Sequence, residues 1–432
     1  MSSRSILLVA YFYPPCTDTG AQRPAAMVKW LRRLGHRVSV LTTSAYGSEE
    51  PGAELADATH RTGDLQLLRA RLSGQSHVGA MYDSDTYSGR PHPLSRVVVP
   101  EPLLAAWGPF ALAAAGRLAR RERFDAVITT SPPETVHAIG RSLRRRHGIP
   151  WVADIRDAWN FEPLRPEFPT RLQKRLDGAL ERRWLGAADV VVGVSEPAVA
   201  DMRTRLGLAE TALITNGWDP EGEVAEIDRS PEDAPASSGR PAGRLDPERV
   251  SLVYTGRFGS YGRDPRGLLD GLALLARDDP ESAARLELVI AGPLTEAERP
   301  LFERDVSPAR IVLAGSVRRS EALRLQRSAD ALLLVAMPTR SQLLNFKLFE
   351  YLAAERPILA LAEGTDAARV AREAGGDAVR ADDPVAIAAA LARVARGQLA
   401  APAPAAREPY EYPGPAERMA AAVELAIARR PT

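Results

Sequence analysis

Lys347 and Glu350 lie three residues apart in the segment FKLFEYLAAERPILA, at 346–360. On a helix this spacing places both side chains on one face. Pro357 ends such a helix, and the apolar residues after it predict a buried parallel strand over 358–361. A carboxylate at the start of this helix, beside the carboxyl end of a sheet, suits two adjacent ribose hydroxyls. Taken alone, the fragment fits an ion pair between Lys347 and Glu350 on the surface better than it fits a ribose site.

A second group of ionisable residues follows another predicted strand. Asp154, Arg156 and Asp157 stand in WVADIRDAWN, where an apolar run ends, and His137 stands in the preceding segment SPPETVHAIG. Catalytic groups of doubly wound sheets gather at such strand ends. The same residues also fit a local salt-bridge cluster or a helix N-cap.

Four loops carry residues that suit a phosphate or a planar base. Gly20 lies in the turn YFYPPCTDTGAQRPA, where backbone N–H groups can approach a phosphate at a helix N-terminus. Arg257 and Arg263 follow a predicted strand in YTGRFGSYGRDP, where they fit either phosphate binding or a solvated surface. The turn of Gly20 also fits an ordinary connection between a strand and a helix.

The backbone of Ser316 and Val317, in AGSVRRSE, suits the edge of a nucleobase. Thr339 and Ser341 precede the helix of Lys347, where hydroxyls or backbone amides suit phosphates.

The elements that position these residues are predicted by apolar runs that alternate with helical patterns. Strands are predicted at 6–10, 37–41, 126–130, 151–154, 190–194, 251–254, 286–291, 311–314, 331–335 and 358–361. This alternation predicts two Rossmann-like α/β domains in tandem, with parallel sheets and with ligands at the carboxyl ends of both sheets, in a central cleft.

The segments that interrupt this alternation of strands and helices set the predicted domain boundaries. The predicted parts are an N-terminal domain at 1–215 with an insertion at 44–95, a linker region at 216–249, a second α/β domain at 250–408 and a C-terminal segment at 409–432 with a helix from about 416 to 430. The linker region is marked by its charged, Pro, Gly and Ser-rich composition.

Composition narrows the function classes. The chain has 432 residues, a formal net charge of +1 and one cysteine, which excludes an intrachain disulfide and a multi-cysteine metal site. The longest nearly uncharged apolar run, 103–116, is too short to span a bilayer. We expect a cytoplasmic, bacterial protein. Basic clusters at 117–124 and 142–148 fit peripheral contact with the inner face of a membrane, or solvated helix faces.

The motifs together resemble those of retaining glycosyltransferases of family 4, whose fold is called GT-B. The matching patterns are KLFEYLA-x-G-x-PIL, S-x-P-P-x-S-x-H followed by W-V-A-D-x-R-D-x-W, and P-P-x-x-G-G-x-x-R. Four residues depart from the family. Gln342 stands where an earlier glutamate is usual, Glu355 replaces the glycine before the strand, Thr19 replaces a glycine of the first loop, and Arg263 stands where lysine is usual.

The resemblance implies a role for each candidate residue. Glu350 would hold the ribose of a sugar donor, while Arg257 and Arg263 would neutralise its diphosphate as charge builds on the leaving oxygen. The residues expected near the anomeric carbon or the acceptor are Asp154, Arg156, Asp157 and His137. The residues expected around the nucleotide are Gly20, Arg257, Arg263, Ser316, Val317, Ser341, Lys347 and Glu350. The domain at 1–215 would bind the acceptor, the domain at 250–408 would bind the nucleotide sugar, and the C-terminal helix would cross back to the first domain.

The sequence therefore predicts a metal-independent, retaining glycosyltransferase with no cofactor. Its partners would be a nucleotide-sugar donor, UDP-sugar being favoured, and a hydroxyl acceptor in glycan, glycolipid or specialised-metabolite biosynthesis, without nucleic acid. Two alternatives stay open. One is a non-hydrolysing sugar-nucleotide epimerase, and the other is a catalytically inactive GT-B partner subunit.

Overall fold

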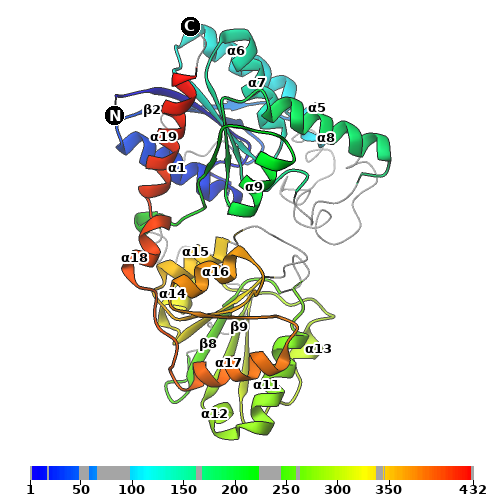
Figure 1. Ribbon diagram of the computed structural model, residues 1–432, viewed down its shortest axis with the longest axis vertical. Helices are drawn as coiled ribbons and strands as arrows, with labels where there is room; N and C mark the ends of the chain where they lie inside the picture. The colour runs from blue at the N-terminus through cyan, green and yellow to red at the C-terminus, as the bar shows by residue number, and fades with distance from the viewer. Residues whose placement is uncertain are drawn as a thin grey trace. The chain divides into compact units, whose positions relative to one another are not determined.

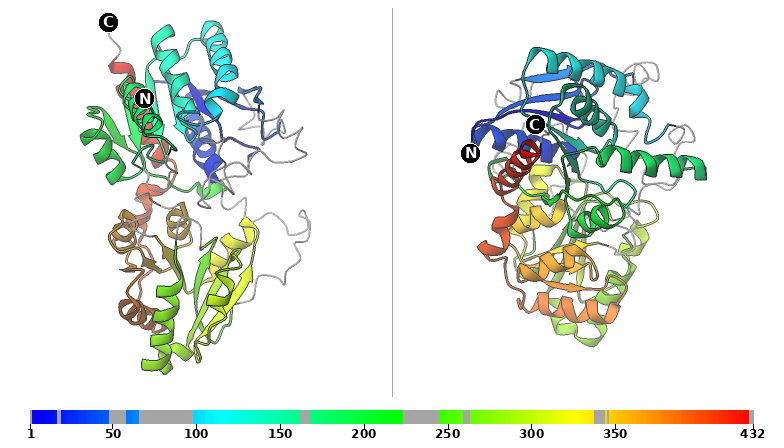
Figure 2. Two further views of the ribbon diagram at one scale, coloured as in Figure 1. Left: turned by 90° about the vertical axis from the view of Figure 1, so that its right-hand side faces the viewer. Right: turned by 45° about the horizontal axis from the view of Figure 1, so that its top comes forward.

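The computed structural model describes residues 2–16, 19–47, 58–65, 98–161, 168–222, 245–258, 263–336, 344 and 346–429 (Figure 1). The chain divides into two compact units. The first comprises Met1–Asn216 and Tyr412–Thr432, and the second comprises Gly217–Glu411. Each unit has its own parallel sheet with helices on both faces (Figure 2).

The sheet of the first unit has the strand order β3-β2-β1-β4-β5-β6-β7. Its strands are β1 (Ser5–Ala10), β2 (Arg37–Thr43), β3 (Thr59–Thr62), β4 (Ala126–Ser131), β5 (Trp151–Ile155), β6 (Val190–Gly193) and β7 (Thr211–Leu213). Its helices are α1 (Gln22–Arg33), α5 (Leu103–Ala106), α6 (Gly108–Arg121), α7 (Thr135–His147), α8 (Arg171–Leu185), α9 (Glu196–Thr204) and α19 (Gly414–Ala428).

Both faces of this sheet are buried, which explains why its central strands are continuous apolar runs. In β1, Leu7 and Val9 belong to one hydrophobic cluster, whereas Ile6 and Leu8 belong to another. The second cluster also contains Met419 of α19. The C-terminal helix therefore packs on the first unit, as the family resemblance implied.

The sheet of the second unit has the strand order β10-β9-β8-β11-β12-β13. Its strands are β8 (Val250–Thr255), β9 (Leu286–Ala291), β10 (Arg310–Gly315), β11 (Ala331–Val335), β12 (Ile358–Leu361) and β13 (Asp377–Val379). Its helices are α11 (Arg266–Asp278), α12 (Pro280–Ala284), α13 (Arg299–Phe302), α14 (Arg319–Ser328), α15 (Phe346–Ala353), α16 (Asp366–Glu373), α17 (Pro384–Ala395) and α18 (Pro404–Arg407).

The predicted strands are all present, but the prediction missed β3, β7 and β13. These three are edge strands, and β3 lies inside the segment that was expected to be an insertion or long loop. Glu355, after α15, has a φ of 59°, the left-handed region that suits the glycine usual at this position. None of the described helices is long and apolar enough to cross a bilayer.

Candidate nucleotide-sugar site

Glu350 lies on α15 and is only 7% exposed. Its carboxylate accepts a hydrogen bond from the Arg319 guanidinium at 2.5 Å and one from Gln326 Nε2 at 3.4 Å, both donors coming from α14. Gln326 Nε2 also donates to Thr255 Oγ1, at 2.9 Å, at the carboxyl end of β8. Two helices and a strand end therefore fix the position of this carboxylate.

The electrostatics keep Glu350 ionised. Burial raises its pKa, but the positive charges of Arg319 and Lys347 outweigh burial and hold the pKa below its usual value. The pKa of Lys347 is itself lowered, chiefly by burial and further by Arg263 and Arg319, although Glu350 opposes this. A buried, charged acceptor thus lies within a cluster of cations. The sequence analysis identified two of these cations, Lys347 and Arg263, and missed the third, Arg319.

The turn after β8 brings Lys347 against the backbone. Gly256 has a φ of +111°, and a Cβ built on it would lie 2.6 Å from Lys347 Nζ. A Cβ on Gly292, after β9, would lie 2.0 Å from the carbonyl oxygen of Gly256. The two turns can approach each other only because Gly292 has no side chain, and Lys347 can approach the first turn only because Gly256 has none. Lys347 therefore lies at the carboxyl ends of the central strands.

Arg257 and Arg263 lie near the same strand ends. Arg263 donates from Nε to the Val335 carbonyl, at 3.1 Å, and from Nη1 to the Arg257 carbonyl, at 3.0 Å. Tyr254 donates its hydroxyl to the same Arg257 carbonyl at 2.8 Å. These bonds fix the backbone of Arg257, whose side chain is exposed. The structure therefore brings together Arg257, Arg263, Lys347 and Glu350 at one edge of the second sheet.

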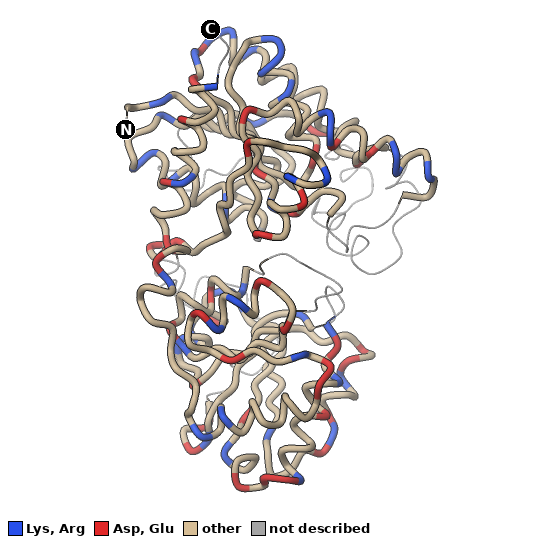
Figure 3. The backbone as a smooth tube through the Cα atoms, in the orientation of Figure 1, with Lys and Arg blue, Asp and Glu red and all other residues tan. Residues whose placement is uncertain are grey.

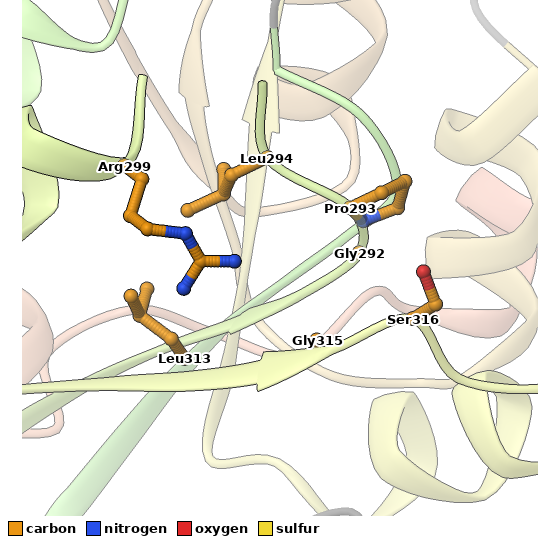
Figure 4. A pocket seen from close by; sticks show the side chains of 7 residues that line it. All are labelled: Gly292, Pro293, Leu294, Arg299, Leu313, Gly315 and Ser316. Carbon is orange, nitrogen blue, oxygen red and sulfur yellow. The ribbon is translucent and has the colours of Figure 1, made fainter. Parts of the chain in front are cut away.

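A pocket of about 200 Å³ opens beside this edge, where β9 and β10 end (Figure 4). It is lined by Gly292, Pro293, Leu294, Arg299, Leu313, Gly315 and Ser316. The Arg299 guanidinium points toward it from α13, a residue that the sequence analysis missed. Ser316 lines the pocket, whereas Val317 packs against the hydrophobic core of the unit. Thr339, Ser341 and Gln342 lie outside the described residues.

In the first unit, Asp154 forms a buried ion pair with Arg23 of α1. The pair is bidentate, with distances of 3.0 Å and 2.8 Å, and both side chains are 2% exposed. Thr130 Oγ1 also donates to Asp154 at 2.8 Å, so both carboxylate oxygens are occupied. This geometry matches the salt-bridge interpretation of Asp154, and its assignment as a catalytic residue stays a prediction.

Arg156 binds backbone carbonyls rather than a carboxylate. Its Nε donates to the Ser131 carbonyl at 2.7 Å, and Nη1 donates to the carbonyl of Gly20. The side chain thus joins the turn after β1 to the loop after β4. Asp157, the next residue, is exposed at the end of β5. Gly20 and Arg156 are therefore brought together, while Asp157 faces solvent.

His137 is fully buried beside Trp151 and Trp159, with ring centroids 6.2 Å from each. Trp151 Nε1 donates to Thr129 Oγ1 at 2.8 Å, and the Thr129 hydroxyl lies 2.9 Å from His137 Nδ1. If the hydroxyl donates onward, the ring hydrogen is on Nε2, which has no partner among the described residues. Burial lowers the pKa of His137 to about 3. The ring is thus neutral rather than cationic.

The described residues contain no cluster of three or more His, Cys, Asp or Glu side chains that could hold a metal ion.

Known proteins resemble both units. The first matches the family model described as "Glycosyl transferase 4-like domain" over residues 19–217, and the second matches "Glycosyl transferases group 1" over residues 249–396. The chain carries the two domains of a GT-B glycosyltransferase. No curated protein matches this glycosyltransferase in sequence.

Solved structures share the fold of this glycosyltransferase over nearly its whole length. The α,α-trehalose 6-phosphate synthase of Burkholderia multivorans has a TM-score of 0.60 at 15% identity, with 99% of each chain covered. Anabaena HepE, solved with UDP and glucose, has a TM-score of 0.53 at 13% identity, covering 98% of this chain and 99% of HepE. A Listeria monocytogenes protein, described as a candidate UDP-N-acetylglucosamine 2-epimerase, has a TM-score of 0.52 at 14% identity, covering 98% of this chain and 96% of that one.

Glu101 is a buried carboxyl group of the glycosyltransferase that the sequence analysis did not identify. It accepts hydrogen bonds from the backbone N–H groups of Leu103, at 2.8 Å, and Thr135, at 3.0 Å, where α5 and α7 begin. Burial, and then the negative charge of Glu134, raise the pKa of Glu101 to about 7, although these hydrogen bonds oppose the shift. The fold therefore favours the protonated carboxyl.

This shift predicts a pH-dependent stability. Because the pKa of Glu101 in the folded protein lies above the ordinary value of 4.5, the stabilisation is fully present below pH 4.5 and is lost as the pH rises through about 7. A shift of this size corresponds to about 3 kcal/mol. Relative to Glu101→Gln, the wild type should lose about that much free energy of unfolding between pH 4.5 and pH 8, measured by urea denaturation. The exposed Glu122→Gln variant should follow the wild type; parallel curves for wild type and Glu101→Gln would refute the assignment.

Proposed function

We propose that the protein is a retaining glycosyltransferase that binds a nucleotide-sugar donor at the carboxyl edge of its second sheet. The observation that carries the proposal is the ionised Glu350 carboxylate, held by Arg319 beside Lys347 and the Gly256 turn. A charged acceptor in a buried site suits a pair of ribose hydroxyls, which would donate to it. The neighbouring cations suit the diphosphate.

The proposal also gives a binding site to the base of the nucleotide. The base would occupy the pocket of Ser316 and Arg299, which adjoins the Gly256 turn through Gly292. HepE has been solved with UDP and with UDP-glucose, which supports UDP as the first choice of nucleotide.

The proposed reaction exchanges one glycosidic bond for another. The bond between the sugar C1 and the diphosphate oxygen breaks, and a bond from C1 to the acceptor oxygen forms on the same face. The acceptor proton passes to the departing phosphate. Arg257, Arg263 and Lys347 would stabilise the charge that develops on the leaving oxygen, so that these side chains supply what a metal ion supplies elsewhere.

Donor hydrolysis tests this proposal without knowledge of the acceptor, because water can replace the acceptor hydroxyl. UDP-glucose, UDP-N-acetylglucosamine and GDP-mannose are each incubated with the protein in EDTA and followed by proton NMR. We expect UDP release from a UDP-sugar, with the free sugar first appearing as the α-anomer of the donor. An initial β-anomer would contradict retention. Conversion to an epimer without acceptor would favour the epimerase, and the absence of both turnover and binding would favour an inactive subunit.

A further inference from the structure

Helix α8 turns its acidic residues inward. Asp177 is fully buried and accepts a hydrogen bond from Trp159 Nε1 at 3.1 Å. Glu181 is 2% exposed and pairs with Arg205 at 2.7 Å. These are the only carboxylates of α8. All of the negative charge of the helix therefore lies on the buried face, which packs on the first unit.

The outward face of α8 is apolar and basic. Leu172 is 75% exposed and Leu176, one turn later, is 49% exposed. Surface helices normally turn such residues toward the core. The exposed basic residues of the same helix are Arg171, Lys174, Arg175, Arg182 and Arg183. Figure 1 shows α8 extending away from the sheet of the first unit, and Figure 3 shows Lys and Arg along it.

The positive charge continues from α8 onto α7. The pKa of Arg141 is lowered by burial and then by the nearby charges of Arg145 and Arg183, so three guanidinium groups lie close together across the two helices. Arg145 and Arg183 are exposed. Such a cluster of like charges favours an anionic partner.

We propose that the outward face of α8 docks on an anionic membrane surface. Leu172 and Leu176 would enter the boundary between headgroups and acyl chains, and the flanking arginines would bind lipid phosphates. A second copy of this chain fits the face less well. Two leucines offer far less than the roughly 800 Å² per partner of a standard interface, and the arginines of two copies would repel each other. The proposal is independent of sugar transfer.

Vesicle co-sedimentation of the full chain tests the proposal. We expect binding to vesicles of phosphatidylglycerol and phosphatidylcholine, and none to vesicles of phosphatidylcholine alone. The double variant Leu172→Asn, Leu176→Asn should reduce the partition coefficient at least tenfold. Val385→Asn, which alters a residue that is 72% exposed on α17 of the second unit, is the matched control and should bind as the wild type does.

A second variant tests the charge. Arg175→Gln combined with Arg183→Gln should weaken binding at least tenfold at low salt, and the loss should shrink as ionic strength rises. Arg277→Gln, at a residue 70% exposed on α11, is its control. Failure of the wild-type protein to bind anionic vesicles would overturn the proposal. So would a dimer in analytical ultracentrifugation that the leucine variant dissociates, because the face would then be a contact between copies.

Discussion

Replacement of Asp154 by asparagine is expected to lower the free energy of unfolding of the first unit by about 3–5 kcal/mol. The change removes the counter-charge of Arg23, which is 3% exposed and would remain ionised in the interior. Arg23 also donates to the carbonyls of Ile214, at 2.9 Å, and Thr215, at 2.7 Å, so it cannot turn to solvent without breaking further bonds. Tryptophan fluorescence during urea denaturation measures the loss, because Trp218 is the only tryptophan outside the first unit.

Two comparisons separate the buried pair from ordinary charge loss. Glu424→Gln, on α19 of the same unit, removes a carboxylate that is 30% exposed and paired with Arg4, and should cost less than about 1 kcal/mol. Arg23→Met combined with Asp154→Leu removes both charges and should recover much of the stability lost in Asp154→Asn. A free energy of unfolding of Asp154→Asn within about 1 kcal/mol of the wild-type value would show that the buried ion pair does not stabilise the first unit.

The second large effect is expected at Glu350. Glu350→Gln should weaken UDP binding at least tenfold, equivalent to about 1.4 kcal/mol or more, because a neutral amide replaces the ionised acceptor for the ribose hydroxyls. Titration calorimetry measures the dissociation constant. Arg319 is 38% exposed, so solvent can accommodate its charge in the variant and the fold should persist.

Glu363→Gln is the matched control for Glu350→Gln. Glu363 lies in the same unit and pairs with Arg372, but its side chain is 39% exposed. This variant should bind UDP as the wild type does. Equal affinity of Glu350→Gln and wild type, with both folded by circular dichroism, would remove Glu350 from the ribose site.

The strands could be predicted where burial on both faces imposes a continuous apolar run. The predicted ranges of β9, β11 and β12 coincide with those in the structure. The missed strands β3, β7 and β13 lie at sheet edges, where one partner strand defines the element and no apolar run is required. β3 reads THRT and is visible only through its pairing with β2.

The candidate site was predictable only in part, because its ion pairs join distant segments. Glu350 followed from a local motif, but its partner Arg319 lies 31 residues away on another helix. Asp154 and Arg23 are 131 residues apart. A carboxylate at the end of a buried strand does predict that a cation is buried beside it, because an ionised group in the interior requires a partner of opposite charge. The sequence does not say which arginine supplies it.

The central claim is that the second unit holds the nucleotide of a sugar donor through Glu350 and the neighbouring cations. Titration of UDP into the wild-type protein in EDTA tests it most directly. We expect saturable binding at one site per chain, which Glu350→Gln weakens at least tenfold. No binding of UDP, GDP or their sugars, or binding that Glu350→Gln leaves unchanged, would contradict it.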